Sequence, residues 1–175
     1  MKRLMLLRHA KSAHDDAVAD KGRPLDARGR NDAVRVGGDM HRKHYLPELV
    51  LCSPAKRTVE TWQLLAPELA APAAVQFPDR LYLASDAMIV TLVRAVDDAV
   101  SVLLVIGHNP GLERCVRTLV REPTSAMERR LATIADISFA TCSLAVLDFD
   151  VEVWSHAGAA GGALVDLVRP KDLHA

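Results

Sequence analysis

The sequence has few cysteines and no long hydrophobic run. Its three cysteines, Cys52, Cys115 and Cys142, are odd in number and far apart. They predict neither a disulfide framework nor a metal site, and they fit a reducing cytoplasm. The apolar run near the start covers only residues 4–7, which is too short for a signal peptide or a membrane span. We therefore expect a cytoplasmic protein that does not enter a membrane.

An excess of charge of either sign is also missing, because 22 Lys and Arg residues balance 22 Asp and Glu residues. Proteins that bind nucleic acid or anionic membranes carry a basic surface, so we expect neither partner. Any anion must be bound by a local cluster. No repeat or linker divides the 175 residues, which are enough for one buried core. We expect a single domain over residues 1–175.

Apolar runs alternate with helical patterns along most of the chain. We expect strands at residues 4–7, 48–52, 74–77, 100–106, 143–149, 151–154 and 164–168, and helices at residues 26–44, 54–69, 86–96 and 110–120. The run VSVLLVI at residues 100–106 is typical of a central strand covered on both faces. The alternation predicts an α/β fold, a three-layer α/β/α sandwich with a mostly parallel central sheet.

Side-chain patterns suggest how the expected helices begin and pack. We expect Ser53 and Asn109 to cap the helices that follow them, because both side chains can accept from backbone N–H groups. Val34, Val36 and Met40 are candidates for the inner face of the first helix.

Basic residues follow three of the expected strands. Arg8 and His9 follow the first strand, Arg57 lies near the start of the helix after the second, and His108 follows the central strand. In parallel α/β sheets, ligands bind beyond the carboxyl ends of the strands. These four side chains should therefore meet. Such a cluster of cations and donors repels itself when empty and favours a dianion such as phosphate.

The four residue types fit one kind of chemistry. A neutral imidazole can attack phosphorus and become a phosphohistidine. Arginines stabilise the equatorial oxygens of the transition state, so neither a metal nor a cofactor is needed. Nearby positive charge should lower the pKa of the histidine that attacks and keep it neutral.

The segments LLRHAKS, LVLCSPAKRTVET and LLVIGHNPGL resemble the three signature blocks of the histidine phosphatase superfamily, also called phosphoglycerate mutase-like. The short length, RPLDARG and LVRPKDL resemble its SixA-type phosphohistidine phosphatase branch. The resemblance implies the phosphoglycerate mutase-like fold, His9 as the nucleophile, and Arg8 and Arg57 as phosphate clamps. His108 matches the second pocket histidine, and we expect it to bind the phosphate by donating to its oxygens. Asp15 falls where many members have a pocket asparagine, so it is a candidate phosphate-binding residue.

The general acid of many members is a glutamate shortly after the third strand. At the matching place this chain has Leu83, which cannot donate a proton, and Asp86 is the nearest carboxylate and the candidate acid. An alkoxide leaving group needs a proton in the transition state, whereas imidazole leaving from phosphohistidine needs less help. The missing glutamate favours phosphohistidine, or an activated phosphate, over an alkyl phosphate ester.

Three functions remain open at this point. The resemblance implies a phosphatase for phosphohistidine on a protein, such as a histidine phosphotransfer domain in signal transduction, with inorganic phosphate as product. A phosphomonoesterase for a small phosphorylated metabolite and a non-catalytic module that binds phosphorylated partners are the alternatives. Elsewhere in the chain, we interpret His41 and His44 as an exposed polar face rather than a metal pair, and Trp62 and Trp154 as core residues.

Overall fold

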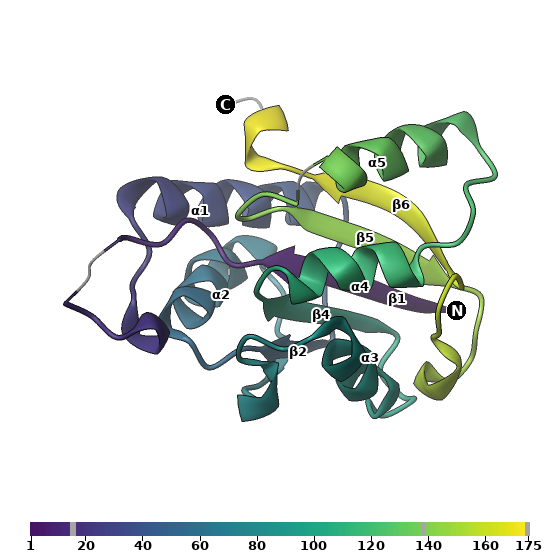
Figure 1. Cartoon of the computed structure of the whole chain (residues 1–175), viewed down its shortest axis with the longest axis horizontal. Helices are drawn as coiled ribbons and strands as arrows, with labels where there is room; N and C mark the ends of the chain where they lie inside the picture. Colours follow the sequence, from purple (N-terminus) through teal and green to yellow (C-terminus); the bar gives the residue numbers. More distant parts are fainter. Residues whose placement is uncertain (15–16, 138, 174–175) are drawn as a thin grey trace.

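The computed structural model describes residues 1–14, 17–137 and 139–173, so Asp15 lies outside the described residues. Its centre is a six-stranded sheet with the order β3-β2-β4-β1-β5-β6 (Figure 1). The strands are β1 (Lys2–Arg8), β2 (Leu49–Cys52), β3 (Ala74–Gln76), β4 (Val102–Gly107), β5 (Leu144–Phe149) and β6 (Gly162–Val168). No helix of the described residues is long and apolar enough to cross a membrane.

The sheet is mostly parallel, as predicted. β1, β2, β3 and β4 run parallel to one another, β5 is antiparallel to its neighbour β1, and β6 is antiparallel to β5. In the register, Arg8 lies beside Gly107, and Cys52 lies beside Ile106. The carboxyl ends of β1, β2 and β4 therefore meet at one edge of the sheet.

Helices cover both faces of the sheet and confirm the predicted α/β/α sandwich (Figure 1). They are α1 (Ala27–Arg42), α2 (Lys56–Leu69), α3 (Asp86–Arg94), α4 (Gly111–Leu119) and α5 (Ala126–Ile137). Alternate residues of β1 belong to two separate cores. Leu4 and Leu6 pack with α3 and α4, whereas Met5 and Leu7 pack with α1 and α2. Because both faces are covered, residues 4–7 of β1 and residues 102–106 of β4 are all apolar.

After α4 the structure differs from the prediction in two places. Residues 151–154 form no strand, because the chain turns there into the short 3₁₀ helix η3 (Trp154–His156). Trp154 is fully buried, and its indole N–H donates to the Val100 carbonyl at 2.8 Å, which holds this turn against the sheet. The polar segment after residue 120 contains α5, which we did not predict. Trp62 is also buried, as expected.

The predicted caps and one inner-face residue need correction too. α2 begins at Lys56 and α4 at Gly111, so neither Ser53 nor Asn109 is the cap. Both side chains make longer-range contacts instead, described below. On α1, Val36 and Met40 are buried as expected, but Val34 is exposed.

The start of α1 is packed directly against the chain that leaves β1. A Cβ atom on Gly29 would lie 2.1 Å from the Lys11 carbonyl oxygen, so only glycine fits without a backbone shift. Gly38, in the same helix, has no atom within 4 Å of such a Cβ. The fixed distance between α1 and Lys11 therefore depends on Gly29.

We expect Gly29→Ala to lower the free energy of unfolding by about 1–3 kcal/mol, because the new methyl group must push the Lys11 backbone aside. The matched variant Gly38→Ala should raise the free energy by about 0.5–1 kcal/mol, because alanine favours the helix and nothing opposes it. Urea unfolding of both variants measures the difference. Similar changes for the two would contradict the close contact at Gly29.

Candidate active site

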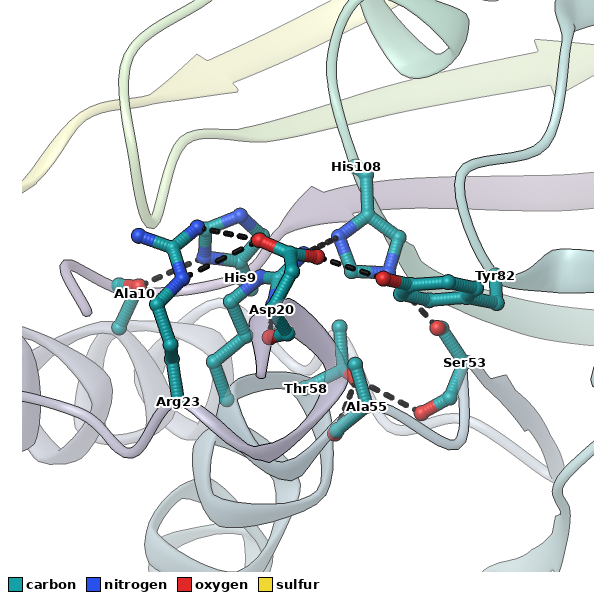
Figure 2. A network of polar contacts seen from close by, with 10 residues as sticks. His9, Ala10, Asp20, Arg23, Ser53, Ala55, Thr58, Tyr82 and His108 are labelled. Carbon is teal, nitrogen blue, oxygen red and sulfur yellow. Dashed lines mark hydrogen bonds and ion pairs between the residues drawn. The ribbon is translucent and has the colours of Figure 1, made fainter. Parts of the chain in front are cut away.

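A cavity of about 390 Å³ opens at the sheet edge where β1, β2 and β4 end. Its walls include Arg8, His9, Arg57 and His108. Three segments far apart in the sequence supply these residues, and the structure brings all four together. Figure 2 shows the polar network that includes His9 and His108.

His9 follows the last residue of β1, and its backbone N–H donates to the Gly107 carbonyl at 3.1 Å. In its buried ring, Nδ1 lies 2.8 Å from the Ala10 carbonyl oxygen. A carbonyl oxygen can only accept, so Nδ1 carries the proton and Nε2 keeps its lone pair. Burial, together with the charges of Arg57 and Arg8, lowers the pKa of His9 to about 4. The ring is therefore neutral at pH 7 and able to act as a nucleophile.

The second histidine, His108, is fixed by two partners. Its Nδ1 lies 3.2 Å from Nη2 of Arg57, and its Nε2 lies 2.7 Å from the Ser53 hydroxyl oxygen. A guanidinium can only donate, so Nδ1 accepts and Nε2–H donates to Ser53. Burial, together with the Arg57 charge, lowers the pKa of His108 to about 3. Its ring centre is 5.2 Å from that of His9, so two neutral imidazoles stand side by side.

Arg8 and Arg57 line the cavity together with two further cations, Lys11 and Arg23. Arg8 donates from Nη1 to the Phe139 carbonyl at 2.9 Å. The buried Nε groups of Arg8 and Arg57 have no hydrogen-bond partner among the described residues. A buried N–H without an acceptor is unfavourable, so this pair of donors favours an anion in the cavity. A phosphoryl group, which presents three acceptor oxygens, fits this requirement.

Asp20 was not predicted as a site residue, and it makes the densest set of contacts in the cavity (Figure 2). One carboxylate oxygen accepts from Arg57 Nη2 at 3.0 Å and from the Tyr82 hydroxyl at 2.6 Å. The other accepts from Arg23 Nη2 at 2.7 Å. The Asp20 carbonyl also accepts from Arg57 Nη1 at 2.6 Å. These contacts hold the pKa of the Asp20 carboxyl well below its usual range, and the hydrogen bond from Tyr82 contributes most.

The candidate general acid does not line the cavity. Asp86 lies at the start of α3, and its nearest polar partner is the Thr118 hydroxyl at 3.5 Å. Leu83 does line the cavity, and its side chain is largely exposed there. At this wall the protein therefore presents a side chain that cannot donate a proton.

Two further side chains near the site explain the missing caps. Ser53, fully buried, accepts from His108 instead of capping α2. The Asn109 amide donates to Glu113 at 3.1 Å and to the Phe139 carbonyl at 3.0 Å. Away from the cavity, His41 Nδ1 contacts the Leu69 carbonyl at 3.0 Å. Within the described ranges, no cluster of His, Cys, Asp and Glu is suited to hold a metal ion.

Comparisons with known proteins agree with this arrangement. The family model of the histidine phosphatase superfamily (branch 1) matches residues 4–81. An uncharacterized protein from Mycobacterium tuberculosis (strain ATCC 25618 / H37Rv) is 35% identical over 141 residues, 81% of this chain and 85% of that protein. An uncharacterized chloroplastic protein from Arabidopsis thaliana is 30% identical over 97% of this chain and 78% of that protein.

Solved structures give the same result. A candidate phosphohistidine phosphatase SixA from Nakamurella multipartitia superposes with a TM-score of 0.81 at 29% identity, over 97% of this chain and 96% of that chain. A protein histidine phosphatase SixA complexed with tungstate shares the fold with a TM-score of 0.78 at 21% identity, over 98% and 99% of the two chains. The chain belongs to the histidine phosphatase superfamily, in its SixA-type branch, and is a histidine-based phosphatase. The predicted family and fold are confirmed.

The position of Asp20 leads to a prediction about phosphate affinity. Its carboxylate accepts from Nη2 of Arg57, a donor that a phosphate could otherwise use, and it repels an incoming dianion. In Asp20→Asn, inorganic phosphate should inhibit more strongly, with a Ki lower by roughly fivefold. This corresponds to about 1 kcal/mol, a modest value because the carboxylate is partly exposed. Competitive inhibition of hydrolysis by phosphate gives the Ki.

Asp79→Asn is the matched control, because Asp79 is exposed and pairs with Lys21 at 3.5 Å outside the cavity wall. Its Ki for phosphate should stay unchanged. A higher Ki in Asp20→Asn would show that Asp20 orients Arg57 for phosphate rather than competing with it.

Proposed function

We propose that the protein is a metal-independent protein phosphohistidine phosphatase that works through a phosphohistidine intermediate on His9. The observation that carries the proposal is the pairing of a neutral nucleophile with unmet donors. Nε2 of His9 has a free lone pair, and the buried Nε groups of Arg8 and Arg57 lack an acceptor. A phosphoryl group in the cavity would place phosphorus at the lone pair and acceptor oxygens beside the two guanidinium groups, which line the same cavity.

In the first step, Nε2 of His9 attacks phosphorus in line as the bond from phosphorus to the substrate nitrogen breaks. Arg8 and Arg57 stabilise the charge on the equatorial oxygens, as magnesium does in other phosphoryl-transfer enzymes. The substrate imidazole leaves neutral if its other ring nitrogen carries a proton. No group on the enzyme then has to donate one.

In the second step, water attacks phosphorus and the bond to His9 breaks, releasing inorganic phosphate. Because Nδ1 keeps its proton toward the Ala10 carbonyl, the phosphorylated ring is a cation. It therefore leaves as a neutral imidazole, which is a good leaving group. The same hydrogen bond that exposes the lone pair of His9 for attack also prepares His9 to depart.

The substrate class is inferred from the cavity wall. Leu83 stands where an acid would protonate an alkoxide, and Asp86 faces Thr118 instead of the cavity. The similar structures from Nakamurella multipartitia and Agrobacterium tumefaciens, at 29% and 26% identity, are candidate phosphohistidine phosphatases. A histidine phosphotransfer domain is the proposed partner. The buried, separate cysteines support a reducing cytoplasm as the compartment.

One observation favours the alternative of a phosphomonoesterase for a small phosphorylated metabolite. The Tyr82 hydroxyl, held by Asp20 at 2.6 Å, lies next to Leu83 in the sequence. It is the proton source that a phosphomonoesterase mechanism would use for an alkoxide leaving group. Binding without catalysis is set aside, since the chain is a histidine-based phosphatase.

Two peptides of one sequence, carrying phosphohistidine or phosphoserine at the same position, separate these functions. We expect kcat/KM for the phosphohistidine peptide to be higher by roughly 100-fold, because only the ester needs a general acid. EDTA should leave both rates unchanged. In Leu83→Glu, which restores a carboxylic acid at the wall, the rate on phosphoserine should rise relative to phosphohistidine.

A preference for the phosphoserine peptide would instead support the phosphomonoesterase. A loss of activity in EDTA that added metal restores would show that the metal-free mechanism is wrong.

A further inference from the structure

The catalytic cavity continues on one side into a second depression. Thr141 lines both, and the second depression, of about 80 Å³, is also lined by Arg28, Arg169 and Lys171. The residue after Thr141, Cys142, donates its backbone N–H to the His9 carbonyl at 3.1 Å. The second depression therefore begins beside the proposed nucleophile.

A larger groove extends the path along α1. It has a volume of about 860 Å³, shares Arg28 and Lys171 with the small depression, and adds Arg35. We call the combined surface the basic groove and define it by Arg28, Arg35, Arg169 and Lys171. It joins the carboxyl end of the sheet to the segment that follows β6.

The basic groove is more positive than the chain as a whole, whose net charge is zero. Asp32 is the one acidic residue that lines it among the described residues, and it lies 3.6 Å from Arg28 and 3.7 Å from Arg35. Asp172 pairs with Arg169 from outside the lining. The basic groove thus has four cationic side chains and two carboxylates paired with them.

Two of the four cations, Arg28 and Lys171, are available to a ligand. The side chain of Arg28 is 69% exposed, and the carboxylate of Asp32 beside it is buried. Lys171 is exposed and makes no ion pair within the part of the chain that the structure describes. Exposed charges next to a cleft attract an oppositely charged partner and fix its orientation.

The size of the basic groove indicates the kind of partner. The catalytic cavity, at about 390 Å³, already has room for a small phosphorylated molecule, and the open groove beyond it is larger. A surface that continues past the cavity suits a macromolecule that carries the phosphoryl group. We propose that the basic groove binds acidic side chains of the phosphorylated protein substrate next to its phosphohistidine. This inference rests on the proposed function.

Two phosphohistidine peptides test it, one with glutamates and the other with glutamines flanking the phosphohistidine. The wild-type protein should prefer the glutamate peptide by roughly tenfold in kcat/KM at low salt, through KM, with the preference falling as salt is added. Arg28→Glu combined with Lys171→Glu should abolish the preference while leaving hydrolysis of free phosphoramidate unchanged. Lys171→Glu alone, which breaks no ion pair among the described residues, should reduce the preference for the glutamate peptide by roughly threefold.

Arg130→Glu is the matched control, because Arg130 is exposed on α5 and lines none of these cavities. It makes the same change of net charge as Lys171→Glu alone and should keep the preference. Equal wild-type rates on the two peptides, or the same loss in Arg130→Glu, would overturn the docking role and leave the proposed function intact. Hydrolysis of neither peptide, with hydrolysis of phosphoserine, would overturn the proposed function and the docking role with it.

Discussion

The hydrogen bond from Nδ1 of His9 to the Ala10 carbonyl is the contact on which the active site depends. It fixes which ring nitrogen carries the proton, so the other nitrogen presents its lone pair to the cavity. Ala10 is itself held in place, because its backbone N–H donates to the Thr61 hydroxyl at 3.0 Å. Thr61 in turn donates to the Arg57 carbonyl at 2.6 Å. One chain of contacts thus connects the proposed nucleophile to the helix that carries the clamping arginine.

Arg8 and Arg57 can line one cavity because the two histidines that line it with them are neutral. Burial and positive neighbours lower the pKa values of His9 and His108 to about 4 and about 3. If either ring were protonated at pH 7, it would add a further positive charge to a buried cationic cluster. Asp20 supplies the opposite charge in the structure. A phosphoryl dianion would bring more negative charge to the same donors.

The features of the fold that the sequence predicts are those set by local patterns. The unbroken apolar runs of β1 and β4 predict buried strands because both faces of the sheet are covered. Basic residues at three strand ends predict the convergence of Arg8, His9, Arg57 and His108, because parallel strands share one edge. Physical rules about strand direction were enough for this part of the site.

The features that the sequence does not predict depend on contacts between distant segments. Asp20 reaches Arg57 across 37 positions, and no local pattern marks it as a cavity residue. Serine is a residue type that commonly caps helices, but the Ser53 hydroxyl pairs with His108, 55 positions away. At residues 151–154, alternating apolar side chains suggested a strand, yet the indole of Trp154 bonds to Val100 and the chain turns. In each case a tertiary partner decides the local conformation.

The central claim is that His9 carries the phosphoryl group between substrate and water. A radiolabelled phosphohistidine peptide, mixed with the protein and quenched rapidly in base, tests this claim most directly. We expect a protein-bound label that is stable in base, is lost in acid and maps to His9, with neither label nor turnover in His9→Ala. Undiminished turnover by His9→Ala, or a label on another residue, would contradict the account.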